Sequence, residues 1–289
     1  MTITEPTKAQ SKPLSSRPYA KLTKSEPSVT TLIGLLDKPG LSWGAAKETA
    51  LFAVHHQDEW MDMDPSEAVN RLRLHHKGVW DSAKNMGSLV HSVMESWING
   101  ETPNIGALVA DVAAWRNQAE AKLAEANDYV DGLERFFNEC SPEGFTTEVV
   151  VAKPGFYVGT RDLFGTITLP GTDRKVTALL DLKTTANKKE GSAVYGREWA
   201  LQLAAYNYAP EIRNYARDRS GKVIIESTEP NEPADFCGIV QLRGDGKYQL
   251  YEIPMSVELY DTVLSLSELA KALKTNISTP ILSNEMEGL

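Results

Sequence analysis

The sequence lacks several features that would place it in well-defined classes of protein. Its 289 residues include two cysteines, Cys140 and Cys237, which is too few for the disulfide framework of a small secreted domain. No apolar run approaches the roughly 20 residues that a membrane-spanning helix requires. The opening segment MTITEPTKAQ has no apolar centre of the kind found in a secretion signal. We therefore expect a protein of the reducing cytoplasm, without a membrane partner.

The sequence also lacks a net positive charge. Its formal charge of −9 argues against a protein that coats nucleic acid non-specifically, since such proteins are basic. It does not exclude an enzyme that acts on nucleic acid, because local charge matters more there. The segment from Gly159 to Ala200 has a net charge of +2. It contains seven basic and five acidic residues: Arg161, Arg174, Lys175, Lys183, Lys188, Lys189 and Arg197, against Asp162, Asp173, Asp181, Glu190 and Glu198.

Enough apolar residues are present to build a substantial core. The chain is 42% hydrophobic and 24% charged, which suits one large domain or two small ones. We expect a single domain over residues 26–275, with a helical part at 26–140 and an α/β part at 141–275. Residues 1–25 are rich in Thr, Ser, Pro and Lys and predict a disordered tail, and residues 276–289 predict a short acidic tail.

The pattern of the N-terminal half is typical of helices. Ser28 can cap a short helix, Ser42 a second one, and Asp64 followed by Pro65 predicts the start of a third. The predicted helices are 28–36, 43–57, 64 to about 75, 81–99, and one or two helices over 105–140, broken near 127 or 131. Trp43 could stack on a base, but such a residue more often anchors helix packing, and we interpret it so.

The C-terminal half alternates strand and turn signals. Runs rich in β-branched and aromatic residues predict strands, and the Pro170–Asp173 and Arg243–Gly246 segments predict tight turns. The predicted strands are 145–153, 158–169, 175–184, 235–242 and 247–253. The predicted helices are 198–208, a turn or two over 211–219, and 256–274, with a polar loop over 220–234. These elements predict an α/β fold, with a central mixed sheet of about five strands and helices on both sides.

One hairpin carries the residues that suggest chemistry. Asp181 and Lys183 leave the same face of their strand, and the hairpin would bring Asp162 beside Asp181. Two carboxylates can hold a hard divalent cation such as Mg²⁺ or Mn²⁺, and a neighbouring lysine can steady developing negative charge. Taken alone, an Asp-x-Lys pair is more often a solvated ion pair. The helix that follows places Gln202 and Tyr206 one turn apart, on one stripe.

Four short motifs in a fixed order carry a family resemblance. They are Gly87-Ser88-Leu89-Val90-His91 on a predicted helix, Gly159-Thr160-Arg161-Asp162 and Asp181-Leu182-Lys183 on predicted strands, and Gln202-Leu203-Ala204-Ala205-Tyr206 on a predicted helix. In this order the sequence resembles the PD-(D/E)XK nuclease superfamily, and within it the RecB-type exonucleases. It also resembles phage-encoded members of that branch, through the Pro27-Ser28-Val29-Thr30-Thr31 opening and the Lys38-Pro39-Gly40-Leu41 step. The resemblance covers roughly Pro27 to Tyr206 and implies a restriction-endonuclease-like core.

The resemblance implies a role for each matching residue. Asp162 and Asp181 would be catalytic metal ligands and Lys183 the catalytic lysine, with His91 and the backbone carbonyl of Leu182 as further ligands. Gln202 and Tyr206 would contact DNA or brace the site. Two more carboxylates are possible supporting residues. Glu148 stands on the preceding strand, and Glu95 either orients His91 or is a surface carboxylate.

The chain departs from part of the family in its cysteines. The CRISPR-associated and AddB-like relatives hold an iron–sulfur cluster with four cysteines, and two cysteines cannot supply four thiolates. We therefore expect Mg²⁺ or Mn²⁺ and no iron–sulfur cluster.

The function that the resemblance implies is a metal-dependent DNA exonuclease of recombination, repair or phage DNA processing. A recombination protein is a possible partner, and a phage-encoded enzyme would act in the host cytoplasm. Two alternatives stay open at this point. One is a structure-selective endonuclease with the same core, and the other is a non-catalytic nucleic-acid-binding protein that retains the fold.

Overall fold

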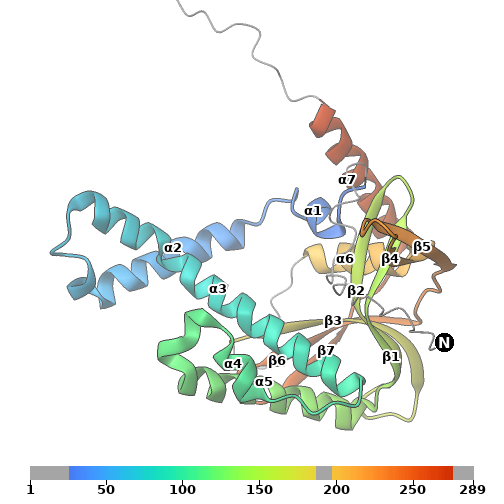
Figure 1. The fold of residues 1–289 in the computed structure, drawn as a ribbon, viewed down its shortest axis with the longest axis horizontal. Coiled ribbons are helices and arrows are strands. Elements are labelled where there is room, and N and C mark those ends of the chain that lie inside the picture. The colour runs from blue at the N-terminus through green and yellow to red at the C-terminus, as the bar shows by residue number, and fades with distance from the viewer. Residues whose placement is uncertain (1–25, 187–196, 276–289) are drawn as a thin grey trace, which may run out of the picture.

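The computed structural model describes residues 26–186 and 197–275. The tails predicted at 1–25 and 276–289 lie outside these ranges. The fold is mixed α/β, as predicted, with a seven-stranded sheet and a largely helical N-terminal half (Figure 1). Within the described ranges, no helix is both long and apolar enough to cross a membrane.

Helices make up the chain as far as residue 140. They are α1 (Val29–Ile33), α2 (Pro39–His55), the 3₁₀ turn η2 (Gln57–Glu59), α3 (Pro65–Ile98), α4 (Ile105–Ala110), the 3₁₀ turn η3 (Ala113–Gln118) and α5 (Ala119–Cys140). Two of the expected caps are confirmed. The Ser28 side chain accepts a hydrogen bond from the Thr31 amide at the start of α1, and Asp64 accepts one from the Ser66 amide at the start of α3.

Strands and two more helices follow residue 140. They are β1 (Glu143–Lys153), β2 (Tyr157–Thr168), β3 (Lys175–Thr185), α6 (Arg197–Asn207), β4 (Glu211–Arg217), β5 (Val223–Pro230), β6 (Phe236–Arg243), β7 (Tyr248–Glu252) and α7 (Val257–Thr275). The strand order is β5-β4-β1-β2-β3-β6-β7. Every neighbouring pair is antiparallel except β3 and β6, which are parallel. A parallel pair requires a long crossover, and α6 with the β4–β5 hairpin supplies it.

The sheet divides the core into two layers. On one face, α3 and α5 pack against alternate residues of β2 and β3, including Leu163, Leu180 and Leu182. On the other face, α1, α6 and α7 pack against the intervening residues, including Leu179. Because strand side chains alternate, Asp181 and Lys183 share the face of Leu179 and point towards α6.

Several sequence-based boundaries were wrong. The segments predicted as helical turns at 211–219 and as a loop at 220–234 form strands β4 and β5, so the sheet has seven strands rather than about five. The residues of β5 are mostly exposed, so no buried alternation marked this strand. Its β-branched run Val223-Ile224-Ile225 was the available signal.

The predicted helix breaks were also misplaced. No break occurs near Asp81, because α3 is one helix of 34 residues and no proline or positive-φ glycine interrupts it. Helix α2 begins at Pro39 rather than near Trp43, since proline is well suited to the first helical position. The 105–140 segment breaks at the η3 turn rather than near 127 or 131.

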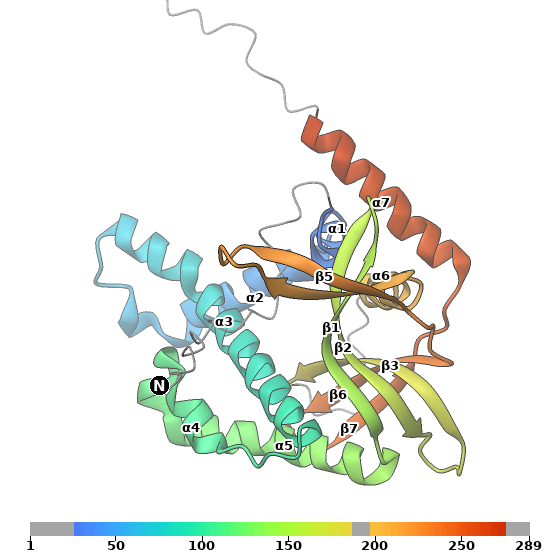
Figure 2. The same cartoon turned by 45° about the vertical axis from the view of Figure 1, so that its right-hand side comes forward.

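The sheet forks at the point where the two predicted carboxylates meet. The β2–β3 ladder runs from Thr168↔Lys175 to Leu163↔Leu180 and stops there. Beyond it, the first half of β2 stays paired with β1, whereas the last residues of β3 stay paired with β6. Figure 2 shows β1 and β2 rising away from β3, β6 and β7. Asp162 and Asp181 are the first residues inside this fork.

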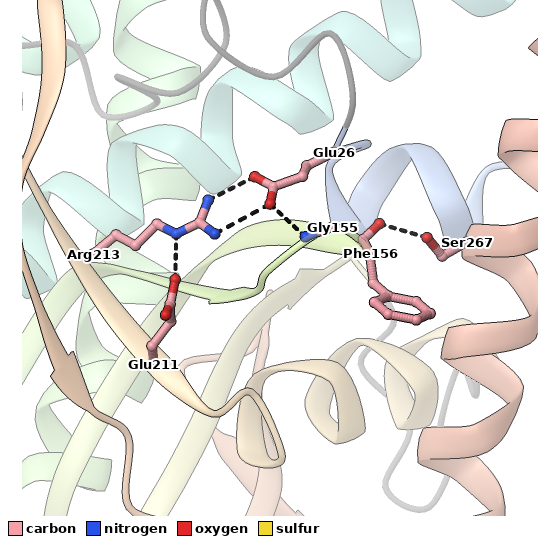
Figure 3. A network of polar contacts seen from close by, with 6 residues as sticks. All are labelled: Glu26, Gly155, Phe156, Glu211, Arg213 and Ser267. Carbon is pink, nitrogen blue, oxygen red and sulfur yellow. Dashed lines mark hydrogen bonds and ion pairs between the residues drawn. The ribbon is translucent and has the colours of Figure 1, made fainter.

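A polar network holds the segment before α1 onto the raised half of the sheet (Figure 3). Arg213 of β4 donates to Glu26 at 2.6 Å and to Glu211 at 2.6 Å, and the Gly155 amide donates to Glu26 at 2.7 Å. The Val158 amide also donates to the carbonyl of Pro27. These bonds fix the entry of α1 beside β2, and so beside the fork.

We expect Glu26→Gln to lower the free energy of unfolding by about 2 kcal/mol, because it leaves the buried Arg213 with Glu211 as the one remaining carboxylate of its two. Burial alone would raise the pKa of Glu26, but the hydrogen bonds from Arg213 and Gly155 lower it below its ordinary value. The stabilisation is therefore full above the unfolded-state pKa and is lost as pH falls through the lower folded-state pKa.

Denaturant titrations at several pH values measure both effects. Glu143→Gln is the matched control, because its ion pair with Lys175 is more than half exposed and contributes little. Equal destabilisation by the two variants would contradict the role given to Glu26.

Candidate active site

Two aspartates face one another inside the fork. The β2–β3 register that ends at Leu163↔Leu180 places Asp162 next to Asp181, on the face that α6 covers. Burial raises the pKa of Asp162 well above its ordinary value, and the charge of Asp181 raises it further, with partial opposition from Lys183. The charge of Asp181 thus disfavours the ionisation of Asp162.

Lys183 and Gln202 hold Asp181 from two sides. The ammonium of Lys183 lies 2.5 Å from Asp181 Oδ2, and the side-chain amide of Gln202 donates to Asp181 Oδ1 at 3.0 Å. Gln202 Nε2 also lies 3.3 Å from the hydroxyl of Tyr206. Since Gln202 and Tyr206 are both buried, their geometry suits bracing of Asp181 rather than contact with a large ligand.

His91 reaches the fork from the opposite layer. It stands on α3, and its Nε2 lies 3.3 Å from the carbonyl oxygen of Leu182 and 3.9 Å from Asp162 Oδ2. Burial lowers the pKa of His91 below its ordinary value, and Lys183 adds to this effect while Asp181 opposes it. The neutral imidazole, which is the form that binds metals, is therefore favoured.

Glu148 is the third carboxylate at the fork. The β1–β2 register pairs Thr147 with Leu163 and Val149 with Arg161, which leaves Glu148 opposite Asp162. Ligand atoms of His91, Glu148 and Asp162 all lie within 4.8 Å of one another. The backbone of Glu148 has φ of 53°, a left-handed conformation that non-glycine residues seldom adopt and that costs of order 1 kcal/mol.

This group of residues fits a hard divalent cation. Lys183 pairs with the buried Oδ2 of Asp181, and Asp162 and Glu148 lie together on the neighbouring strands. Like charges on neighbouring strands destabilise a sheet, and a cation among them would remove that cost. Carboxylate oxygens with a backbone carbonyl and one imidazole are a donor set that Mg²⁺ and Mn²⁺ accept.

Lys183 carries a positive charge in this setting. Burial alone would lower its pKa, but Asp181 and Asp162 more than offset that effect, so the pKa is raised above its ordinary value. Its ammonium also lies 5.9 Å from the ring centre of Trp199 on α6. A lysine held in this state can stabilise negative charge or orient a water, but it is a poor base.

A small polar cavity of about 80 Å³ lies beside the carboxylates, between α1 and α6. Its lining consists of Ser28, Val29, Thr30, Glu148, Gly159, Thr160, Asp162, Gln202 and Tyr206. The sequence did not indicate the contribution of α1. The signals in this stretch were the capping pattern of Ser28 and the resemblance of residues 27–31 to phage-encoded members, and neither says what the helix start would face.

The glycines of the first two motifs have different surroundings. A Cβ at Gly159 would lie 2.4 Å from Cε1 of Tyr206 and 2.9 Å from Cγ2 of Val29, so the bare backbone there is what allows Tyr206 and α1 to pack on β2. A Cβ at Gly87 would lie 3.6 Å from Oγ1 of Thr184, which is an ordinary contact.

Other residues singled out from the sequence lie apart from this centre. Glu95 is exposed one turn beyond His91, and the structure gives no hydrogen bond between them. Arg161 is buried, donates to Asn231 at 2.7 Å and stacks on Phe164, so it adds nothing to a basic surface. Lys188 and Lys189 lie outside the described residues.

Comparisons with known proteins add little to this geometry. No protein-family model matches the chain, and no curated protein matches it. Among solved structures, one titled "Crystal structure of SSO0001" is 14% identical, with a TM-score of 0.28, over 65% of this chain and 74% of that chain. A similarity this low supports no argument about function.

We expect Gly159→Ala to lower the free energy of unfolding by roughly 1–3 kcal/mol, because Tyr206 and Val29 must move to admit the methyl group. Gly87→Ala is the matched control on α3. It should leave stability unchanged or raise it by up to about 1 kcal/mol, since alanine favours a helix over glycine. Urea titrations measure both, and a neutral Gly159→Ala would contradict the packing described here.

We expect Asp162→Asn to be at least as stable as the wild type without metal, and to lose stabilisation by metal. The folded-state pKa of Asp162 is raised, so ionising it costs stability at pH values above its unfolded-state pKa. Metal that binds the folded state at 100 times its Kd should add about 2.7 kcal/mol to the wild type.

Thermal unfolding with Mn²⁺, Mg²⁺ or EDTA tests this expectation. Asp173→Asn, in the exposed β2–β3 turn, should respond to metal as the wild type does. A metal response that survives in Asp162→Asn would place the cation elsewhere.

Proposed function

We propose that this protein is a metal-dependent deoxyribonuclease that hydrolyses phosphodiester bonds at DNA ends. The observation that carries the proposal is the convergence of His91, Asp162, Asp181 and Lys183 at the fork of the sheet. These residues come from three of the four motifs that resemble RecB-type PD-(D/E)XK nucleases. The fourth motif supplies Gln202, which braces Asp181.

Asp162 and Asp181 would hold the cation, with His91 and the carbonyl of Leu182 as further ligands. A bound Mg²⁺ or Mn²⁺ would polarise the phosphodiester and lower the pKa of an attacking water. Glu148 is close enough to His91 and Asp162 to join the ligand set. The ligands come from two layers, because Asp162 and Asp181 belong to the sheet and His91 to α3.

Lys183 would act as a fixed positive charge. Its raised pKa keeps it protonated, so it would stabilise the negative charge that builds on the phosphoryl oxygens and orient the attacking water. Its place beside Asp181 is held by the 2.5 Å ion pair. The attacking oxygen comes from water, so no covalent enzyme intermediate forms.

Features of the site favour an enzyme over a binding protein that merely retains the fold. Glu148 keeps a strained backbone, and the partly buried Asp162 lies beside Asp181, whose charge raises its pKa. Such arrangements cost stability and tend to occur at functional sites. A protein that bound nucleic acid without cleaving it would gain nothing from these costly arrangements.

The preference for DNA ends rests on the resemblance to the exonuclease branch. The alternative is a structure-selective endonuclease with the same catalytic residues. The two differ in their action on DNA without ends, because an exonuclease leaves a closed circle intact.

We expect the wild type to degrade end-labelled linear DNA with Mg²⁺ or Mn²⁺, to be inactive in EDTA, and to leave closed circles intact. Lys183→Ala should lower the rate by at least about 100-fold, because it removes a charge that acts on the transition state. Labels at the 5′ and 3′ ends, on single- and double-stranded substrates, report the polarity and the strand preference.

Lys175→Ala is the matched control, since Lys175 lies on the same strand but is exposed and paired with Glu143. It should retain wild-type activity. Cutting of closed circles would favour the endonuclease alternative, and DNA binding without cleavage under any metal would favour the binding-protein alternative.

A further inference from the structure

The helical hairpin of α2, η2 and the first half of α3 extends away from the sheet (Figure 1). We refer to residues 40–82 as the arm. Phe52 is its only buried residue. It stacks between His56 and His75, at ring distances of 5.0 and 3.9 Å, and so ties the two helices together. The other residues of the arm are partly buried or exposed.

Helix α2 is apolar on both of its faces. Positions 44, 45, 48, 49, 52 and 53 are partly or fully buried and form the stripe that faces α3. The opposite stripe is exposed and consists of Trp43, Ala46, Lys47, Ala50, Leu51 and Val54. Five of these six residues are apolar, and Trp43 and Val54 are 78% and 64% exposed. A helix that is apolar all round is normally buried.

Trp43 was interpreted from the sequence as a residue that anchors helix packing, but in the structure its side chain is largely exposed. Of the fifteen exposed large apolar side chains in the described part of the chain, nine lie in the arm: Leu41, Trp43, Leu51, Val54, Met61, Met63, Val69, Leu74 and Val79. An apolar surface of this extent is typical of a protein–protein interface.

The charges of the arm indicate what covers it. The arm has four basic and seven acidic residues, a net charge of −3, which disfavours the phosphate backbone of nucleic acid. These charges are also segregated along its length. The tip, residues 57–67, has five acidic residues and no basic one, whereas residues 70–82 have three basic residues and one acidic. Glu59 of the tip pairs with Arg71 inside the same arm, which leaves four acidic residues at the tip and two basic residues in the 70–82 segment to pair with a second copy.

We propose that two copies of this chain pair through their arms, in an antiparallel arrangement that buries the outer stripe of α2. In this arrangement the acidic tip of each arm lies along the basic half of the other, whereas a parallel pair would bring the two acidic tips together. The pairing is isologous and closes on itself, as in most dimers. Helix α2 is about 25 Å long, and the two hairpins together make a four-helix bundle.

The mass in solution tests the pairing. The wild type is expected to have twice the 31.8 kDa mass of one chain in sedimentation equilibrium. Trp43→Glu combined with Val54→Glu places two carboxylates on each outer stripe and should weaken the dimer by at least about 100-fold. Both positions are exposed, so the arm itself should keep its helical circular dichroism.

Leu269→Glu is the matched control, because Leu269 is an exposed apolar residue of α7 outside the arm. It should leave the dimer intact. A monomeric wild type at about 100 μM, or a dimer that the two arm substitutions do not weaken, overturns the proposal. If the wild type is a monomer, the apolar surface of the arm would be covered by a different protein instead of a second copy.

Cross-linking tests the direction of pairing. Met61→Cys marks the tip and Lys77→Cys marks the basic half, while the native Cys140 and Cys237 are buried and should not react. A short bis-maleimide should link a mixture of differently tagged Met61→Cys and Lys77→Cys chains to each other, tip to base. Links between two Met61→Cys chains in preference to the mixed product overturn the antiparallel arrangement.

Discussion

The separation of β2 from β3 is the constraint on which the rest of the structure depends. Where β2 and β3 are hydrogen-bonded to each other, the sheet is continuous and no side chain can enter between the two strands. Once they part at Asp162 and Asp181, backbone and side chains of both strands become accessible from the opposite layer, and His91 on α3 can approach the carbonyl of Leu182. A flat, fully paired sheet would keep the histidine and the aspartates on different faces.

The fork places three carboxylates, one ammonium and one imidazole close together. Lys183 faces Asp181 closely, but Glu148 and Asp162 remain near each other and near a neutral histidine. The surrounding structure holds these groups in place against their repulsion. Gln202 fixes Asp181, the packing of Tyr206 requires the bare backbone of Gly159, and Glu26 ties the segment before α1 to β4. Metal binding would then release electrostatic strain that folding has stored.

The parts of this arrangement that follow local rules could be predicted from the sequence. The β2–β3 turn follows from its turn residues. The proximity of Asp162 to Asp181 and the one-turn spacing of Gln202 and Tyr206 follow from the strand and helix periods. The left-handed backbone of Glu148 could not be predicted, because no glycine or turn signal marks this position within the strand. Strand β5 was missed because its exposed residues carry no alternation. The ion pair of Glu26 could not be predicted, because its partner, Arg213, lies 187 positions away in the sequence.

The continuity of α3 has a mechanical consequence. One uninterrupted helix contains Val69, near the tip of the arm, and His91, inside the fork. From Met86 onward the helix packs into the core. A tilt of the arm would therefore pivot about Met86. Val69 lies about 26 Å to one side of it and His91 about 8 Å to the other. Because no hinge interrupts α3 between these two residues, we expect a tilt of the arm about Met86 to displace His91 about one third as far as Val69.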